Sequence, residues 1–232
     1  LSIEAAIRHG LRNEEFRVHY QPQIDIDSGQ VVGMEALIRW RHQGTMIPPT
    51  TFIPVAEQSG LMQTLDEWVL RTAMREMQTL SKRIGIPVRL AVNLSPQQIQ
   101  HPYFEQKLRG MLHETGFDPK QLEIEITEGM LMVNSHDNLD KLQKIRELGA
   151  KISIDDFGTG FCSFSYLLQY QVDRLKIDQS FVRQAETDIN AASVVRTIIA
   201  MSHGLNIRVV AEGVETDEQL RFLLRKKCDE AQ

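Results

Sequence analysis

Short runs rich in Val and Ile alternate with longer amphipathic segments along almost the whole chain. The runs have the composition of β-strands, and the segments between them carry apolar residues near helical spacing. We predict strands at residues 17–24, 31–40, 88–94, 122–127, 151–156, 174–178 and 207–212. We predict helices at residues 61–83, 102–115, 138–148, 189–203 and 217–226. Strands that alternate with helices of this length form βαβ units, so most of the sheet should be parallel.

The first two predicted strands are joined by a short polar turn rather than by a helix. Asp27, Ser28 and Gly29 lie at its tip, so the sheet should begin with an antiparallel hairpin. Seven strands, with an eighth expected just beyond the end of the chain, fit a closed barrel better than the alternative, an open doubly wound sheet. A chain of 232 residues is long enough for one such domain, spanning residues 1–232. The predicted fold is α/β, a TIM-type (β/α)8 barrel modified by an antiparallel first strand.

The chain carries 26 Lys and Arg against 31 Asp and Glu, which gives a formal charge of −5 without a basic run. This balance argues against DNA or RNA as a partner, because nucleic-acid binding depends on neutralising many phosphates. A small anionic ligand remains compatible with it, since bound metal ions would reverse the sign of the field inside a site.

Cys162 and Cys228 are the two cysteines, and their spacing fits neither a disulfide framework nor a thiolate zinc site. A reducing, cytoplasmic setting is therefore expected. No apolar run approaches the roughly 18 residues that span a bilayer, which leaves open whether a parent protein is anchored in a membrane. The chain begins at Leu1 rather than at an initiator Met, so we expect a domain excised from a larger protein.

Polar residues recur where the predicted strands end. They are Glu35, Asn93, Glu125, Glu128, Asp155, Asp156, Lys176, Asp178 and Glu212. Side chains alternate along a strand, so Glu123 and Glu125 should share the inward face of one strand. By the same rule Ser153 and Asp155 face inward from the next strand, and Lys176 faces inward from the one after. In a barrel these residues converge at the C-terminal ends of the strands, where the fold places its chemistry.

Several converging carboxylates repel one another unless positive charge joins them, and Lys176 alone cannot balance four or five acids. Oxygen ligands from Asp, Glu and Asn are those that Mg²⁺ and Mn²⁺ prefer. The adjacent pair Asp155 and Asp156 suits two cations about 3.5–4 Å apart, with one carboxylate bridging them. This pattern predicts a two-metal hydrolase, and the natural substrate of such a site is a phosphodiester.

Some of these polar residues also fit structural positions. A single inward acid is more often a salt-bridge partner or a helix cap than a metal ligand, and Glu128 and Asp178 fit N-terminal helix positions. The seven histidines show neither HxH nor HExxH spacing. Ser95 lacks a GxSxG setting and is typical of a helix cap. Gly158 and Gly160 lack the spacing of a phosphate-binding P-loop and indicate a flexible loop instead.

The motifs that contain these residues resemble those of a known family. Glu35-Ala36-Leu37 resembles the signature that names the EAL domain. Further matching motifs, in the family's order, are Tyr20-Gln21-Pro22, Phe52-Ile53-Pro54-Val55-Ala56-Glu57, Asn93-Leu94-Ser95, Glu125-Ile126-Thr127-Glu128, Asp155-Asp156-Phe157-Gly158, Lys176-Ile177-Asp178 and Glu212-Gly213-Val214-Glu215. The resemblance runs from about residue 16 to residue 232, and the motif set is highly specific.

The resemblance implies a bacterial phosphodiesterase that cuts cyclic di-GMP to linear pGpG by in-line attack of water, with two Mg²⁺ or Mn²⁺ ions. It assigns one cation to Glu35, Asn93, Glu125 and Asp155, and the second to Asp155 and Asp156, with Glu212 nearby through water. Lys176 would orient or activate the attacking water, while Gln21 and Arg39 would contact the substrate. Glu128 would anchor the loop at residues 157–163, and Glu215 would brace the last acidic motif. Family precedent also implies a homodimer and fusion to sensory or GGDEF domains.

The chain departs from the family pattern in two places. The loop carries Cys162 and Phe164 where Ser and Leu are usual, and both changes preserve size or apolarity. Lys227 replaces a common Gly, and Gln232 aligns with a motif after which the family adds a last strand segment. We therefore expect a truncated last strand, a barrel that stops short of closing, and reduced stability.

Two classes of function remain open at this point. The leading one is an active phosphodiesterase, because every metal-ligand position of the family is filled. The alternative is a receptor that binds cyclic di-GMP without cutting it and signals through a partner. A purely structural domain would leave the acidic residues unexplained.

Overall fold

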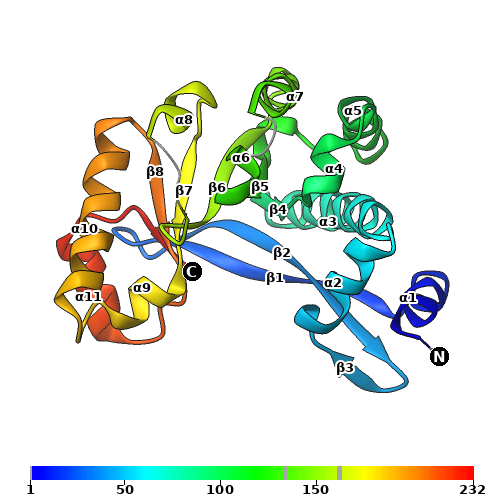
Figure 1. Cartoon of the computed structure of the whole chain (residues 1–232), viewed down its shortest axis with the longest axis horizontal. Coiled ribbons are helices and arrows are strands. Elements are labelled where there is room, and N and C mark those ends of the chain that lie inside the picture. The colour runs from blue at the N-terminus through cyan, green and yellow to red at the C-terminus, as the bar shows by residue number, and fades with distance from the viewer. Residues whose placement is uncertain (1, 133–134, 161–163) are drawn as a thin grey trace.

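Eight strands form a closed barrel in the computed structural model, which describes residues 2–132, 135–160 and 164–232 (Figure 1). The strands of the sheet are β1 (Phe16–Asp25), β2 (Val31–His42), β3 (Thr45–Ile47), β4 (Arg89–Asn93), β5 (Leu122–Thr127), β6 (Lys151–Phe157), β7 (Arg174–Ile177), β8 (Arg208–Ala211) and β9 (Glu230–Ala231). Their order is β1-β9-β8-β7-β6-β5-β4-β2-β3, and β1 also pairs with β2, which closes the ring. Strand β3 pairs with β2 outside the ring. The predicted barrel is confirmed.

Helices connect the strands and surround the barrel in Figure 1. They are α1 (Ile3–Arg12), α2 (Pro49–Gln58), α3 (Met62–Ile84), α4 (Pro96–Gln100), α5 (Phe104–Thr115), α6 (Glu128–Met132), α7 (Ser135–Glu147), α8 (Phe164–Gln169), α9 (Gln179–Gln184), α10 (Ile189–Gly204) and α11 (Asp217–Arg225), with a 3-10 turn at Pro119–Gln121. All five predicted helices are present within a few residues of their expected bounds. The sequence pattern missed α1, α2 and most of the shorter helices. The shorter helices have only one or two turns, which carry little periodicity.

The antiparallel start of the sheet is confirmed. Strands β1 and β2 pair from Phe16 opposite Trp40 to Ile24 opposite Val31. In the turn between them, the side chain of Asp25 accepts hydrogen bonds from the backbone and the hydroxyl of Ser28, which fixes the hairpin. Strands β2 and β4 to β8 then pair in parallel.

Strand β9 is only two residues long, yet it pairs in parallel with β8 and antiparallel with β1. The backbone nitrogen of Gln232 donates to the carbonyl of Ala211 at 2.9 Å, and Val214 donates to the carbonyl of Gln232 at 3.1 Å. This corrects the expectation that the barrel stops short of closing, because two residues and their flanking hydrogen bonds are enough to join β8 to β1. The expected loss of stability stays a prediction.

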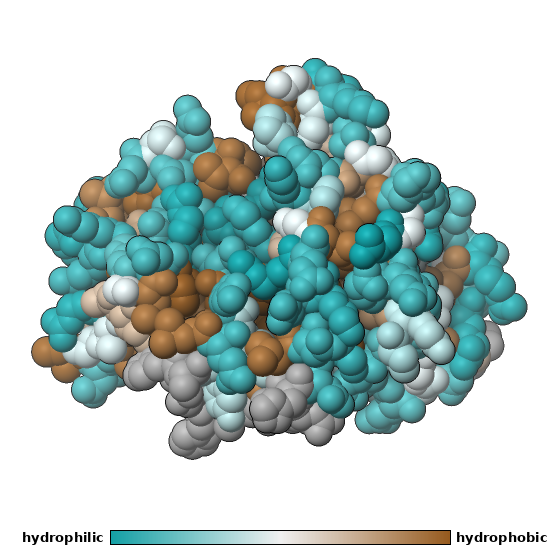
Figure 2. Space-filling model, turned by 90° about the horizontal axis from the view of Figure 1, so that it is seen from above, coloured by the Kyte–Doolittle hydropathy of each residue, from teal (hydrophilic) through white to brown (hydrophobic). Residues whose placement is uncertain are grey.

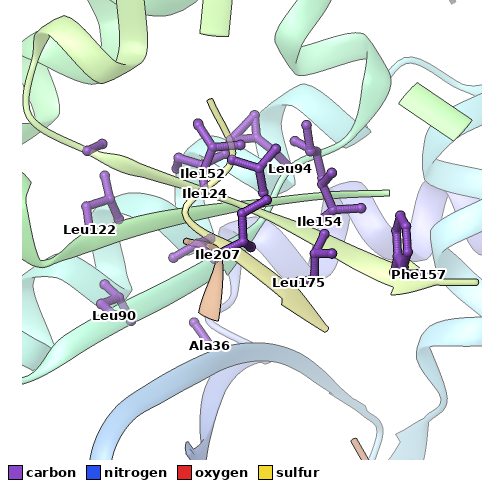
Figure 3. Packing of buried hydrophobic residues seen from close by; sticks show 14 of the residues in the cluster. Ala36, Leu90, Leu94, Leu122, Ile124, Ile152, Ile154, Phe157, Leu175 and Ile207 are labelled. Carbon is purple, nitrogen blue, oxygen red and sulfur yellow. The ribbon is translucent and has the colours of Figure 1, made fainter. Parts of the chain in front are cut away.

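The outward faces of the parallel strands form the main core. Ile124 and Ile152 are completely buried beneath the surrounding helices, and so are Ile154 and Leu175 (Figure 3). The residues between them point into the barrel, as alternation along the strands predicts. A core of this kind fixes the strand register, so it also fixes which polar side chains meet inside the barrel.

A second apolar cluster lies where β1 and β2 extend past the barrel. The rings of Phe16 and Trp40 stack with centroids 5.3 Å apart, and Phe52 of α2 meets both of them edge to face. The indole nitrogen of Trp40 donates to Glu15 at 3.0 Å. This cluster holds α2 beside the end of β2, next to Arg39.

The face of the molecule drawn in Figure 2 is mainly hydrophilic, with separate hydrophobic patches. Among the described residues, no helix combines the length and apolar character that crossing a membrane requires.

Candidate active site

Lys176 lies at the centre of the predicted site, surrounded by carboxylates. Its Nζ atom is 3.0 Å from Glu35 Oε2, 3.0 Å from Glu125 Oε2, 3.1 Å from Asp155 Oδ1 and 2.8 Å from Glu212 Oε1. These residues come from five strands or strand ends, and the side chains of Lys176 and Glu125 are completely buried. The structure therefore brings the inward polar residues together at the C-terminal mouth, as the alternation argument expected.

Asn93 joins the cluster through Glu35. Its Nδ2 atom donates to Glu35 Oε1 at 2.7 Å, and Asn93 follows the position where β4 pairs with β2. Glu35 is the register partner of Ala91, so Asn93 lies two residues further along β4 on the same inward face.

Asp155 and Asp156 are consecutive, so in a regular strand they would point to opposite faces. The pairing of β6 with β7 is irregular between Ile154 and Phe157, and Asp156 has a φ of 53°. This break in the ladder turns both carboxylates toward the mouth. Carboxylate oxygens of Asp155, Asp156 and Glu212 lie within 4.8 Å of one another, close enough to share a cation.

The charges in this cluster are unbalanced. Burial opposes the charge of Lys176, but the four carboxylates outweigh it and raise its pKa well above the usual value. Burial, reinforced by neighbouring acids, raises the pKa of Glu125 well above its usual range and that of Glu212 to about 7. Burial and the charges of Asp155 and Asp178 raise the pKa of Asp156 to about 6. The cluster holds more negative charge than one ammonium can neutralise.

Glu35 behaves differently from its neighbours. Burial alone would raise its pKa, but Lys176 and hydrogen bonds from Gln232, Lys176 and Asn93 lower it below the usual value. A carboxylate held ionised and oriented by several donors is ready to bind a cation.

The donor set suits Mg²⁺ or Mn²⁺. It consists of carboxylates and one amide side chain, which are the oxygen ligands of hard cations. Glu125 Oε1 is buried and has no hydrogen-bond partner among the described residues, so a buried acceptor remains available for a cation. The excess negative charge and this unused oxygen agree with a metal centre.

A pocket of about 470 Å³ opens beside the cluster. Arg39, Asn93, Asp155 and Asp156 line it, together with apolar side chains that include Phe52. Gln21 lies on the neighbouring strand, opposite Glu35 in the ladder, and its side chain is exposed. Arg39 is therefore in the pocket wall, whereas Gln21 lies at the edge of the mouth and does not line the pocket.

Glu128 lies at the start of α6 and holds the loop that follows β6. Its Oε2 atom accepts hydrogen bonds from the backbone nitrogens of Gly158 at 3.1 Å and Gly160 at 3.2 Å. A Cβ atom on Gly160 would lie 2.8 Å from Glu128 Oε1, so a larger residue would push the two apart. Residues 161–163, including Cys162, lie outside the described residues, as does the side chain of Phe164.

The remaining predicted residues lie in different places. Asp178 caps α9 by accepting from the backbone of Ser180 at 3.0 Å, and it lies beside Asp156. The side chain of Glu215 is exposed and accepts from Arg183 at 2.8 Å, so it does not touch the acidic cluster. Gln232 lies inside the barrel, and its side-chain nitrogen donates to Glu35.

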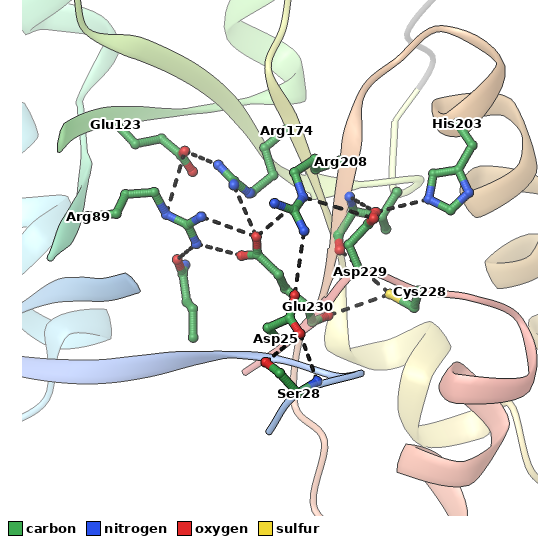
Figure 4. Close-up of polar contacts among 12 residues, drawn as sticks. Asp25, Ser28, Arg89, Glu123, Arg174, His203, Arg208, Cys228, Asp229 and Glu230 are labelled. Atoms are coloured by element: carbon green, nitrogen blue, oxygen red, sulfur yellow. Dashed lines mark hydrogen bonds and ion pairs between the residues drawn. The ribbon is translucent and has the colours of Figure 1, made fainter. Parts of the chain in front are cut away.

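A second layer of charged residues lies beneath the site, and the sequence argument did not identify it as a unit (Figure 4). Arg174 pairs with both Glu123 and Glu230, and Arg89 Nη2 lies 2.5 Å from Glu230 Oε2. Arg89 precedes the inward residue Asn93 by an even number of residues, and Arg174 precedes Lys176 in the same way. Alternation along the strands therefore predicts that both arginines face inward. The partner Glu230 comes from β9, which has too few residues to show a pattern.

The fold and the acidic mouth define an α/β-barrel protein with a cluster of charged side chains at the C-terminal ends of its strands. The EAL domain family model matches residues 4–232, so the chain belongs to the EAL family. This confirms the resemblance found in the motifs.

Individual relatives cover nearly the whole chain. It is 44% identical over 227 residues to a signaling protein of Caulobacter vibrioides, covering 97% of this chain and 28% of that protein. It is 39% identical over 231 residues to the cyclic di-GMP phosphodiesterase NbdA of Pseudomonas aeruginosa, covering 99% of this chain and 29% of that protein. The chain thus spans less than a third of the length of these two relatives.

Solved structures show the same fold. The PaMucR phosphodiesterase in complex with c-di-GMP matches with a TM-score of 0.96 and 37% identity, over 100% of this chain and 94% of that one. The EAL enzyme Bd1971, bound to cAMP and cyclic di-GMP, matches with a TM-score of 0.93 and 31% identity, over 99% of this chain and 63% of that one.

Proposed function

We propose that this chain is a divalent-cation-dependent phosphodiesterase that hydrolyses cyclic di-GMP to linear pGpG. The observation that carries the proposal is the group of four carboxylates around Lys176, with Asp156 beside it, at the mouth of the barrel and next to a pocket. The family relationship to a cyclic di-GMP phosphodiesterase supports the choice of substrate.

The acidic residues divide between two cations. Glu35, Asn93, Glu125 and Asp155 would hold one Mg²⁺ or Mn²⁺ ion. Asp155 and Asp156 would hold the second, with Glu212 binding through a water molecule. Bound divalent cations would lower the pKa of the attacking water and stabilise the negative charge that develops on the phosphate.

Lys176 would act on the attacking water. Its four carboxylate contacts hold the ammonium in one place, and a lysine ammonium group is a hydrogen-bond donor. By donating to the water oxygen, it would point a lone pair at phosphorus, in line with the 3′ oxygen that leaves. The new P–O bond forms as the bond to the 3′ oxygen breaks. That oxygen takes up a proton and the water gives one up, which yields the linear dinucleotide.

The pocket would hold the substrate beside the cations. Arg39 in its wall carries a positive charge suited to a phosphate, and Gln21 at the mouth offers an amide to a base or a sugar. The apolar wall that includes Phe52 suits the face of a purine.

We also propose that the chain works as a homodimer within a longer protein that carries sensory or GGDEF domains. Supporting this, a pocket of about 330 Å³ with apolar side chains from α10 lies against Gly158 and Glu128, so a partner seated there would contact the loop after Asp156. Sedimentation of the chain with and without Mg²⁺ tests the dimer, and a monomer at all concentrations would contradict it.

Incubation of the chain with cyclic di-GMP and either Mg²⁺ or Mn²⁺ tests the proposed reaction. Formation of pGpG that stops when EDTA is added is the expected result. Binding of cyclic di-GMP without formation of pGpG would contradict the proposal and point to a receptor instead.

A further inference from the structure

Gly33 leaves a gap between the buried side chain of Gln23 and the partly buried side chain of Arg89. It is the register partner of Gln23 on β1 and of Arg89 on β4, so three adjacent strands meet at one height inside the barrel. A Cβ atom on Gly33 would lie 2.8 Å from Arg89 Nη2 and 2.8 Å from Gln23 Oε1. The missing side chain therefore allows Arg89 and Gln23 to meet across β2.

These two residues begin a row of directed hydrogen bonds. Arg89 Nη2 donates to Gln23 Oε1 at 2.5 Å, and Gln23 Nε2 donates to Gln232 Oε1 at 2.9 Å. Gln232 Nε2 then donates to Glu35 Oε2. The row joins β4, β1, the end of the chain and β2, and it finishes on a carboxylate of the acidic cluster.

The direction of every bond in this row is fixed by Arg89. A guanidinium group only donates, so the amide oxygen of Gln23 must face it, and the NH₂ group of Gln23 must face Gln232. The oxygen of Gln232 accepts that bond, which leaves its NH₂ group toward Glu35. An uncharged amide with no such neighbour could turn over and present its oxygen to the carboxylate, which would repel it.

The row also limits what Glu35 can bind. A carboxylate offers about four lone-pair directions, and Gln232, Lys176 and Asn93 occupy three of them. The remaining direction is left for a cation. Fixed partners of this kind typically change metal affinity by about 10- to 100-fold when they are lost.

We propose that Arg89 and Gln23 are positioning residues, which fix the Gln232 amide and thereby hold Glu35 in the orientation that binds a divalent cation. This inference rests on the proposed cation site. It assigns a function to Gln23, which is completely buried and which the proposed reaction does not otherwise use.

The variant Gln23→Glu distinguishes the proposed positioning role from a simple effect of added charge on cation binding. The new carboxylate would keep the size of the side chain and its contact with Arg89, and its added negative charge would by itself attract a cation. However, it has no NH₂ group, so it would draw the NH₂ group of Gln232 toward itself and turn the amide oxygen toward Glu35. The proposal therefore predicts weaker Mn²⁺ binding, while added charge alone predicts tighter binding.

The test is calorimetric titration with MnCl₂ of the unaltered chain, Gln23→Glu and Gln30→Glu, with thermal melting of each. Gln30 is exposed in the hairpin and provides a control of equal charge. We expect Mn²⁺ affinity to fall about 10- to 100-fold in Gln23→Glu and to stay unchanged in Gln30→Glu. Unchanged or tighter binding in Gln23→Glu, beside normal binding in the unaltered chain, would overturn the positioning role alone. No binding in the unaltered chain would overturn the cation site itself.

A second variant keeps the test decisive if Gln23→Glu does not fold. Gly33→Ala adds one methyl group in the gap, and Gly110→Ala is its control, because a Cβ atom there meets nothing within 4 Å. We expect Gly33→Ala to weaken Mn²⁺ binding and to shift the side-chain amide resonances of Gln232 in NMR spectra. Equal Mn²⁺ affinity and unshifted resonances in the two glycine variants would overturn the proposal.

Discussion

Nζ of Lys176 lies 3.0 Å from Oε2 of Glu125, and both side chains are completely buried. Two opposite charges in this position stabilise each other, but each is costly when the other is removed. Burial raises the pKa of Glu125, and the acids around it raise that pKa further. The pair therefore links the stability of the barrel to the charge state of the site.

Lys176→Ala should lower turnover of cyclic di-GMP by about 10²- to 10⁴-fold, because the oriented donor to the attacking water is lost. Cation binding should remain largely intact, since no metal ligand is removed. The two quantities are measured by pGpG formation and by titration with MnCl₂. Near-normal turnover would show that the function assigned to Lys176 is wrong.

The same variant should also be less stable in EDTA, by about 3–5 kcal/mol, because four carboxylates lose their shared partner. Added Mn²⁺ should restore much of that loss, as a ligand that binds only the folded state stabilises it. Urea unfolding with and without Mn²⁺ measures both effects. Equal stability of Lys176→Ala and the unaltered chain in EDTA would contradict this account.

Asp155→Asn should abolish cation binding and turnover together, because Asp155 is the ligand assigned to both cations. Asp27→Asn removes the same charge from the exposed hairpin tip and serves as the matched control. Titration with MnCl₂ and a turnover assay on both variants provide the measurement. Full binding of Mn²⁺ by Asp155→Asn would exclude the bridging arrangement.

Arg39→Ala should raise the KM for cyclic di-GMP by about 10-fold or more, with a smaller effect on kcat, because the contact is made before the reaction begins. Arg17 is its register partner on β1 and does not line the pocket, so Arg17→Ala is the control. Steady-state kinetics with cyclic di-GMP give KM and kcat for both variants. Equal KM values for the two variants would remove Arg39 from the substrate site.

The buried carboxyl of Asp66 should make the stability of the folded protein depend on pH. Asp66 is not one of the proposed cation ligands. Burial raises the pKa of this carboxyl to about 7, although Ser95 donates two hydrogen bonds that lower it. In the unfolded chain the pKa returns to about 3.9. Between these values the folded state holds a proton that the unfolded state has lost, so this group's contribution to stability falls as pH rises from about 4 to 7.

Asp66→Asn cannot titrate, so its stability relative to the unaltered chain should rise over that pH interval. The slope of the difference is at most about 1.4 kcal/mol per pH unit. Urea unfolding of both proteins at pH 5, 6, 7 and 8 measures it. Parallel stability profiles would show that Asp66 stays ionised in the folded state.

Much of the fold and the site could be predicted from the sequence, because alternation along strands is a local property. Glu125 and Lys176 were placed inward by counting residues from apolar neighbours, and the structure agrees. The closure by β9 could not be predicted in this way. Its two residues carry no period, and their pairing depends on strands distant in the sequence.

Other features also lie beyond what local alternation can predict. Asp155 and Asp156 are expected at the mouth from the sequence, but the break in the ladder between β6 and β7 that turns both there leaves no sign in the sequence. Glu215 is the last residue of the acidic motif at residues 212–215, and its contact with Arg183 at the surface joins residues 32 positions apart, which alternation does not predict. Gln23 appears in the sequence as one more polar residue of β1, and its importance depends on a glycine in the next strand.

Strand β9 joins the barrel's seam and is followed at once by Gln232, which contacts Glu35. Fraying of this short strand would therefore remove the contact between Gln232 and Glu35 while the rest of the sheet remained paired. Amide hydrogen exchange at residues 230–232 should report an opening free energy below that of the whole barrel. The lifetime of the competent enzyme would then be governed by that local opening rather than by global unfolding.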